Sequence, residues 1–233
     1  MAVNRSREEW KIYNNVFDKF TLALLRKLSG QGYFEELESP LAMGKEANVF
    51  IASTKSDKIV IVKIYRLENC NFNKMLTYIR QDPRYITLRK NKRDIVFNWV
   101  QREFRNLMIA REAIKVPTPI ISKYNVIVME AIGDPIAPEL KNQAPIDPQD
   151  FLDKILKNIK LLWKQGLVHG DLSAFNILND SEEPIFIDFS QATTTKSSDA
   201  KDLLLRDLKN IAAFFKKLSI DLDVDKEFNV VVG

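Results

Sequence analysis

The stretch that decides the fold is His169-Gly170-Asp171-Leu172-Ser173-Ala174-Phe175-Asn176-Ile177-Leu178. It contains the pattern H-x-D-x-x-x-x-N, and Ile187-Asp188-Phe189 follows shortly after it. Phosphoryl transfer needs a carboxylate that orients the attacking hydroxyl and accepts its proton. It also needs a second carboxylate and an amide oxygen that hold the metal ion of a nucleoside triphosphate. Asp171 fits the first role, Asn176 and Asp188 fit the second, and His169 fits a residue that braces the loop.

Each of these motifs also has a simpler interpretation. A lone H-x-D or I-D-F is common by chance, and an Asp and an Asn in one turn usually cap the backbone. The two motifs at this spacing, after a half of the chain that is rich in strands, favour the catalytic interpretation.

The first half of the chain supplies a candidate cation. Lys63 lies in Ile61-Val62-Lys63-Ile64, a β-branched apolar run in which an unpaired lysine is unfavourable. A lysine on such a strand contacts the α- and β-phosphates in the kinase pattern V-A-I-K and pairs with a glutamate on a helix. We predict that Glu103 is this partner. Glu112 on the same predicted helix is the alternative, and a lysine that reaches solvent at a strand edge is the non-catalytic interpretation.

Two further segments are candidates for nucleotide contacts. The segment 41–50 contains Gly44 and Lys45 where a loop would cover the phosphates, although it has one glycine rather than three and is not a P-loop. The segment 126–133 is predicted to be a strand that runs into a hinge. Backbone groups of Glu130 and Ile132 could bind an adenine edge there, with Met129 behind it. A core strand that ends in a turn is the alternative for this segment.

Hydrophobic periodicity predicts strands first and helices afterwards. This order predicts an α+β chain with a small β-rich lobe and a helical lobe. A loop of the length of 66–93 is unusual in a compact domain, so we expect a functional insert there. The predicted strands are 47–52, 59–65 and 125–129. The predicted helices are 7–28, 94–114, 199–218 and one that begins at Pro148, with Asp147 as its cap and Gly166 just after its end. The segment 66–93 is predicted to be irregular.

Composition excludes several classes of protein. The 233 residues are 45% hydrophobic and 28% charged, as in a globular protein. A single cysteine and a single histidine exclude an internal disulfide, a cysteine metal cage and zinc chemistry that needs two histidines. No apolar run is long enough to span a membrane, so we expect no membrane contact.

The net charge of +4 is unevenly distributed. Residues 74–115 carry eleven basic and four acidic side chains, which gives this segment +7. A solvated helix face is one interpretation, and a surface that binds RNA or another polyanion is the other. The densest cluster, and the expected contact with nucleic acid, is Arg89, Lys90, Lys92 and Arg93.

These motifs together resemble the RIO family of atypical protein kinases. The similarity runs from about residue 35 to 218, and the short region before Gly44 resembles the type 1 branch rather than type 2, which has a winged-helix domain there. Gly170 departs from type 1, where alanine is more common. The four similar motifs are Gly44-Lys45-Glu46-Ala47-Asn48-Val49, His169 to Asn176, Ile187-Asp188-Phe189-Ser190-Gln191-Ala192 and Arg206-Asp207-Leu208-Lys209-Asn210-Ile211.

The resemblance implies a two-lobed kinase fold that binds ATP with Mg²⁺ or Mn²⁺. Asp171 would be the catalytic base, Asn176 and Asp188 the metal ligands and Lys63 the phosphate contact. The implied organisation is a helical extension over 1–34, an N-lobe over 35–132 with the insert at 66–93, and a reduced C-lobe over 133–233. The residues implied to bind the nucleotide are Gly44, Lys45, Ala47, Val49, Lys63, Met129, Glu130, Ile132 and Ile187.

The resemblance further implies a cytoplasmic serine kinase or ATPase that acts on the small-subunit pre-ribosome. Ser173 stands where many kinases have a lysine, and no A-P-E motif follows Asp188, so ordinary peptides are expected to bind poorly. Two alternatives stay open: a small-molecule phosphotransferase of the aminoglycoside or choline kinase type, and a non-catalytic RNA-binding assembly factor with a nucleotide switch. The oligomeric state is not predicted.

Overall fold

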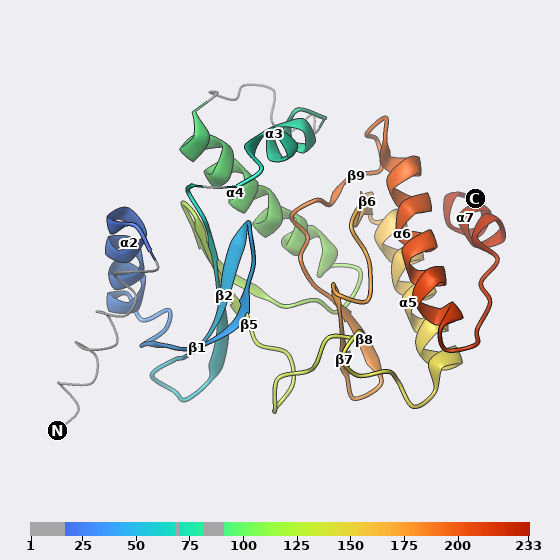
Figure 1. Cartoon of the computed structure of the whole chain (residues 1–233), viewed down its shortest axis with the longest axis horizontal. Coiled ribbons are helices and arrows are strands. Elements are labelled where there is room, and N and C mark those ends of the chain that lie inside the picture. The colour runs from blue at the N-terminus through green and yellow to red at the C-terminus, as the bar shows by residue number, and fades with distance from the viewer. Residues whose placement is uncertain (1–16, 69, 82–90) are drawn as a thin grey trace.

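A sheet of five antiparallel strands forms the first half of the molecule (Figure 1). The computed structural model describes residues 17–68, 70–81 and 91–233. The strand order is β1-β2-β3-β5-β4, so β1 and β4 are the edges. The strands are β1 (Leu37–Met43), β2 (Ala47–Ser53), β3 (Ile59–Tyr65), β4 (Pro119–Lys123) and β5 (Val126–Glu130).

Two of these strands are absent from the sequence prediction. β1 begins in a segment with no assignment and ends inside the segment predicted to be a phosphate loop, and Pro40 lies within it. Proline donates no hydrogen bond to a neighbouring strand, so it is tolerated here because β1 is an edge. β4 is the other edge, and it is short. Both missed strands therefore lack the continuous apolar pattern that marks the central strands.

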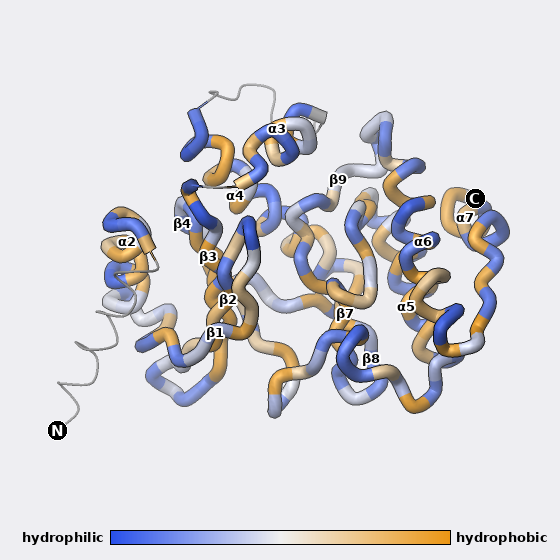
Figure 2. Tube along the Cα trace, viewed as in Figure 1, coloured by the Kyte–Doolittle hydropathy of each residue, from blue (hydrophilic) through white to orange (hydrophobic). Residues whose placement is uncertain are grey.

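Strand alternation divides the sheet into two faces. Val49 is the register partner of Lys63, and Lys63 is in turn the partner of Ile127. Directly paired residues of antiparallel strands project from the same face, so these three side chains share one face. The opposite face carries Val60, Val62 and Ile64, which are buried in a separate apolar cluster with helix α2. Figure 2 shows the hydrophobic residues of β2 and β3 in the middle of the sheet.

Helix α2 (Lys19–Gly30) covers that outer face of the sheet. The prediction of a continuous helix over 7–28 is wrong at residues 17 and 18, because Asp18 has an extended backbone and its carboxylate accepts hydrogen bonds from the N–H groups of Phe20 and Thr21. An aspartate cap of this kind begins a helix and prevents its continuation from residue 17. Residues 7–16 lie outside the described residues.

Helix α4 (Lys92–Ala110) packs near the inner face of the sheet and matches the prediction of 94–114 closely. The prediction that 66–93 is irregular was wrong in part, since Phe72–Gln81 forms helix α3. Met75 and Ile79 of α3 are buried one turn apart in the core that also contains α4. Packing of this apolar stripe, to which the half-buried Phe72, Leu76 and Tyr78 add, stabilises the helix.

The second half of the chain is mainly helical. Asp147 caps helix α5 (Pro148–Lys164) by accepting from the N–H groups of Gln149 and Asp150, as the sequence predicts. Helix α6 (Ala200–Lys216) matches the last predicted helix, and α7 (Val224–Val232) follows it without a matching prediction. Two pairs of short strands connect α5 to α6, namely β6 (Leu167–Val168) with β9 (Thr193–Thr194) and β7 (Ile177–Asp180) with β8 (Glu183–Phe186). No helix in the described residues is long and apolar enough to cross a membrane.

Candidate active site

The sheet and the helical half meet at a buried lysine. The Nζ of Lys63 lies 2.7 Å from Oε1 of Glu103 and 2.9 Å from Oδ1 of Asp188. The contact that the sequence predicts between β3 and α4 is therefore present, whereas Glu112 is exposed beyond the end of α4. Burial lowers the pKa of Lys63, but the two carboxylates outweigh it and raise the pKa above its usual value. The ammonium therefore stays charged and links β3, α4 and the segment after β8.

A tyrosine that the sequence analysis did not single out completes this cluster. The Tyr65 hydroxyl donates to Oε2 of Glu103 over 2.5 Å, so both oxygens of that carboxylate are bonded. The Glu103 side chain is only 1% exposed, and a buried carboxylate needs such partners. Tyr65 follows Lys63 by two residues on the same face of β3, which is the signal that could have identified it.

Asp188 presents a charged carboxylate at the edge of this cluster. Its side chain is 39% exposed, so it remains accessible to a ligand. Burial raises its pKa, but Lys63 and hydrogen bonding from Ser190 outweigh that effect and lower the pKa to about 2. Both Lys63 and the Ser190 N–H contact Oδ1. The second oxygen, Oδ2, is thus the one that these contacts leave for a cation.

The catalytic-loop candidates converge with Asp188 in the structure. Asn176 Nδ2 donates to the Asp171 carbonyl over 2.8 Å, which directs the Asn176 Oδ1 away from that carbonyl. The Ile187 N–H donates to the Asn176 carbonyl over 3.0 Å, so the segment that carries Asp188 is held against Asn176. Burial and then the charge of Asp188 raise the pKa of Asp171, which makes its carboxylate a better proton acceptor.

Gln191, which lies in a motif noted in the sequence but was given no role there, holds the Asp171 side chain. Its Nε2 donates to Asp171 Oδ2 over 2.7 Å. In the same segment, the carbonyls of Phe189 and Ala192 accept from the side chain of Asn106 on α4. These contacts fix the segment after Asp188 to both the catalytic loop and α4. They depend on residues that are distant in the sequence, so local patterns could not predict them.

The candidate catalytic loop, residues 169–178, is held in place by His169 and by α6. His169 Nε2 contacts the Ile187 carbonyl over 3.0 Å, and burial lowers the pKa of His169 to about 4, so the ring is neutral. Asp207 accepts from the N–H groups of Gly170 and Leu172 over 2.7 and 2.8 Å. The sequence analysis noted the α6 motif that contains Asp207 but gave that residue no role. A carboxylate within an apolar helical stripe was the available signal.

The residues expected to line a nucleotide lie along one surface of the sheet. Ala47 and Val49 are half-buried on β2, and register places Met129 beside Ile61 on the same face as Lys63. Ile187 is half-buried next to Asp188. Gly44 and Lys45 are exposed at the turn between β1 and β2, where the Gly44 N–H donates to the Ala47 carbonyl. A Cβ on Gly44 would lie 2.9 Å from that carbonyl, so the turn requires glycine.

The hinge after β5 has two of its backbone groups occupied. The Glu130 N–H donates to the Thr118 carbonyl and the Ile132 carbonyl accepts from Ala137 N–H. An adenine edge would therefore have to use other groups, such as the Glu130 carbonyl and the Ile132 N–H.

The structure describes two of the four basic residues that are expected to bind a polyanion. Arg89 and Lys90 lie outside the described residues. Lys92 and Arg93 begin α4, where Lys92 lies over the Phe72 ring and Arg93 over the Phe20 ring. The visible basic residues therefore lie beside aromatic side chains from other elements rather than forming a bare charged helix face.

Comparisons with known proteins identify the family of the chain. A model of the RIO domain matches residues 48–228. The chain belongs to the RIO family. RIO-type serine/threonine-protein kinase Rio1 from Haloferax volcanii is 37% identical over 98% of the chain and 80% of that relative. The Rio1 kinase from Methanocaldococcus jannaschii is 39% identical over 97% of the chain and 79% of that relative. The chain is thus a type 1 RIO kinase, a phosphotransferase.

Solved structures support the same fold. The Rio2 kinase from Chaetomium thermophilum, described as an ADP/Mg²⁺-phosphoaspartate complex, has a TM-score of 0.68 at 24% identity and covers 90% of this chain. This chain covers 65% of that structure. The expected two-lobed α+β kinase fold is confirmed.

Proposed function

We propose that this RIO kinase transfers the terminal phosphoryl group of ATP with Asp171 as the general base. The supporting observation is the convergence of Lys63, Asn176 and Asp188 beside the Asp171 loop. Each comes from a different segment, and together they provide the groups that phosphoryl transfer requires. In this proposal the β-rich lobe comprises 35–132 with its insert, the C-lobe 133–233, and 1–34 an extension.

The donor set fits Mg²⁺ or Mn²⁺ held jointly with the phosphates. Asn176 Oδ1 and an ionised Asp188 are hard oxygen ligands, which these ions prefer. The described residues contain no cluster of three or more His, Cys, Asp or Glu that would bind a metal alone. A site of one carboxylate and one amide is typical of magnesium that keeps water and phosphate ligands. Bound metal would neutralise phosphate charge, and Lys63 would contact the α- and β-phosphates.

The transfer step balances as a displacement at phosphorus. The oxygen of an acceptor hydroxyl forms a bond to the terminal phosphorus, the bond from that phosphorus to the bridging oxygen breaks, and ADP leaves. The hydroxyl proton moves to the Asp171 carboxylate. Gln191 bonds Oδ2 of that carboxylate, so Oδ1 is the oxygen that would take the proton. A serine hydroxyl and a water molecule both satisfy this chemistry, which makes the protein a kinase or an ATPase.

The test compares Asp171→Asn with the exposed α6 variant Asp202→Asn. Purified protein is incubated with γ-labelled ATP and Mg²⁺, with and without a serine-containing test protein, and both protein-bound and free phosphate are counted. We expect Asp171→Asn to lower transfer by about 10²–10⁴-fold while ATP affinity changes little. Asp202→Asn should retain the wild-type rate. Wild-type turnover by Asp171→Asn would rule out this base.

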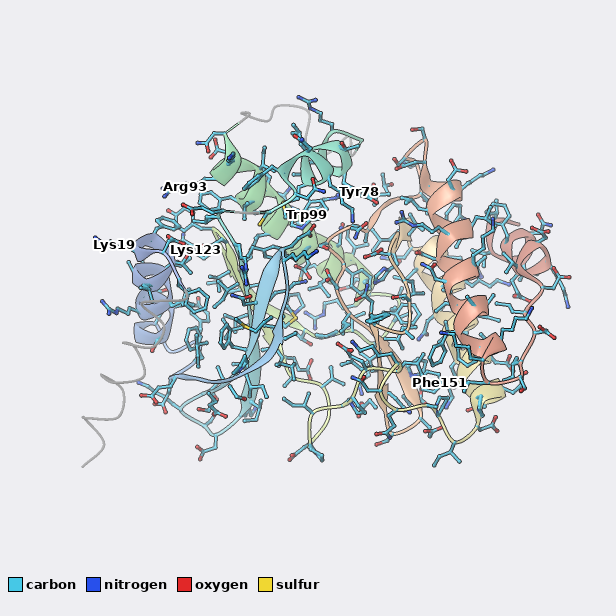
Figure 3. The ribbon with its side chains drawn as sticks, in the orientation of Figure 1. Lys19, Tyr78, Arg93, Trp99, Lys123 and Phe151 are labelled. Carbon is cyan, nitrogen blue, oxygen red and sulfur yellow. The ribbon has the colours of Figure 1, made fainter. Side chains whose placement is uncertain are left out.

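We also propose that the protein acts in the cytoplasm on RNA of the small-subunit pre-ribosome. The supporting observation is a surface where cations and aromatic rings from three segments alternate. Arg93 lies over Phe20, Phe20 contacts Tyr124 at 5.2 Å between centroids, and Lys123 lies over Tyr124. Figure 3 shows Lys19, Arg93 and Lys123 on neighbouring elements at this surface. Single-stranded RNA binds such surfaces by base stacking and phosphate contacts.

The RNA proposal predicts a change in salt dependence. Replacing Arg93 and Lys123 by glutamate should weaken binding to a small-subunit rRNA fragment. The slope of log affinity against log salt concentration should fall by about one for each phosphate that the variant no longer binds. Lys164→Glu, at an exposed position of α5, is the control for a charge reversal elsewhere and should leave the slope close to that of the wild type. An unchanged slope in the double variant would favour a simple solvated face.

A further inference from the structure

The candidate catalytic loop, residues 169–178, offers no cation to the phosphoryl group that is transferred. Ser173 occupies the position at which many kinases have a lysine, and residues 169–178 contain no lysine or arginine. Lys63 contacts two carboxylates at once. The transferring phosphoryl group carries negative charge on its outer oxygens, and enzymes stabilise this charge with positioned donors. A further cation is therefore expected from another element.

Helix α3 begins beside the turn that is proposed to cover the phosphates. The Arg66 N–H donates to the Glu46 carbonyl over 3.0 Å, and the Cys70 thiol contacts the same carbonyl at 3.6 Å. The helix then starts at Phe72. The segment that leads into α3 is thus held beside the turn between β1 and β2 by one backbone hydrogen bond and one thiol contact.

The second half of α3 reaches the catalytic loop. The Tyr78 hydroxyl lies 3.4 Å from an Arg206 guanidinium nitrogen, and Arg206 donates to the carbonyl of Gly170, the residue before Asp171. The Tyr78 ring packs against Trp99 of α4, with both residues visible in Figure 3. The helix therefore spans the distance between the phosphate-covering turn and the proposed catalytic base.

Lys74 lies on this helix between the two anchors. It is exposed, and it precedes Tyr78 by one helical turn, so both side chains share a face. Its backbone N–H is fixed by Asn71 Oδ1 over 3.1 Å. Lys74 therefore lies on the face of α3 whose Tyr78 contacts Arg206, and Arg206 in turn donates to the carbonyl of Gly170 beside Asp171.

We propose that Lys74 binds the terminal phosphate of ATP and stabilises its charge during transfer. This inference rests on the proposed function of the Asp171 site. It assigns to the basic insert a direct part in the reaction, in place of the lysine that Ser173 replaces. The lysine would contact only the terminal phosphate. Its removal should therefore weaken the binding of ATP and leave the binding of ADP unchanged.

The experiment compares Lys74→Met and Lys74→Arg with Arg80→Met. Arg80 is an exposed cation on the same helix, and six residues of separation place it about 120° around the axis from Lys74. Affinities for ATP and ADP with Mg²⁺ are measured by calorimetry, and transfer of labelled phosphate gives kcat and KM.

We expect Lys74→Met to lower kcat by about 10- to 100-fold and to lower the affinity for ATP several-fold, while the affinity for ADP stays unchanged. Lys74→Arg should restore most of the activity, and Arg80→Met should behave as the wild type. Equal ratios of ATP to ADP affinity in Lys74→Met and Arg80→Met would overturn the proposal. If Asp171→Asn remains active, the proposed function fails instead, so the two failures are distinguishable.

Discussion

The buried contact between Lys63 and Glu103 should contribute far more to stability than a surface ion pair of equal length. Lys154 on α5 offers a matched control, because its Nζ lies 2.7 Å from Glu183 and 3.0 Å from Asp150. Lys63 likewise contacts two carboxylates at 2.7 and 2.9 Å. The side chains of Lys63 and Glu103 are 9% and 1% exposed, whereas those of Lys154 and Glu183 are 30% and 60% exposed. The two pairs therefore differ mainly in burial.

The size of the effect follows from that burial. Lys63→Met leaves the Glu103 charge without its ammonium in a site closed to water, which costs about 3–5 kcal/mol of unfolding free energy. Glu103→Gln in the same chain removes that charge, so a double-mutant cycle should give a coupling energy of at least about 2 kcal/mol. The cycle of Lys154→Met with Glu183→Gln should give a clearly smaller coupling energy, because exposed pairs are screened by water.

The assay is urea unfolding followed by tryptophan fluorescence at pH 8 and pH 5. Burial raises the pKa of Glu103, and removal of Lys63 raises it further. A carboxyl group whose pKa is raised on folding contributes stability at low pH and loses it as the pH rises through the folded pKa. The cost of Lys63→Met should therefore be smaller at pH 5 than at pH 8. Equal coupling energies in the two cycles, or a cost that does not change with pH, would refute this reasoning.

Three further predictions concern other parts of the structure. Burial lowers the pKa of His169 to about 4. The unfolding free energy of the wild type relative to His169→Gln should therefore decline by up to about 3 kcal/mol as the pH falls from 7 to 4. A difference in urea unfolding that stays constant with pH would contradict this. Gly170 has φ 75° and a Cβ there would lie 3.2 Å from the Gln191 carbonyl, so Gly170→Ala should lower the melting temperature and cost about 1–2 kcal/mol, whereas unchanged melting would show that the loop adapts. Asp147→Ala removes a helix cap and should cost about 1 kcal/mol in urea unfolding without altering kcat.

The central strands and capped helices could be predicted because their signals are local. β3 is a continuous apolar run, and α5 has its cap, its proline and its apolar stripe within one segment. The edge strand β1 and the helix α3 escaped prediction because each is stabilised by packing against a distant element. α3 presents only two fully buried apolar residues, and a proline lies shortly after it in the sequence.

The candidate site divides in the same way. Lys63, Asp171 and Asp188 stand out because charged residues beside apolar runs need a reason to be there. Gln191 and Asp207 act by hydrogen bonds to backbone or side-chain atoms more than fifteen residues away. The apolar stripe around Asp207 marks it as unusual, but the partners of both residues cannot be read from a local pattern. Sequence thus identified the proposed reacting groups, and the structure was needed to identify the residues that hold them.

The most direct measurement is a crystal structure of the protein with a non-hydrolysable ATP analogue and Mg²⁺. The account predicts that Asn176 Oδ1 and an Asp188 oxygen both lie about 2.1 Å from the metal, with Lys63 Nζ beside the first two phosphates. A nucleotide bound away from Lys63, or a metal ion without Asp188 among its ligands, would contradict it.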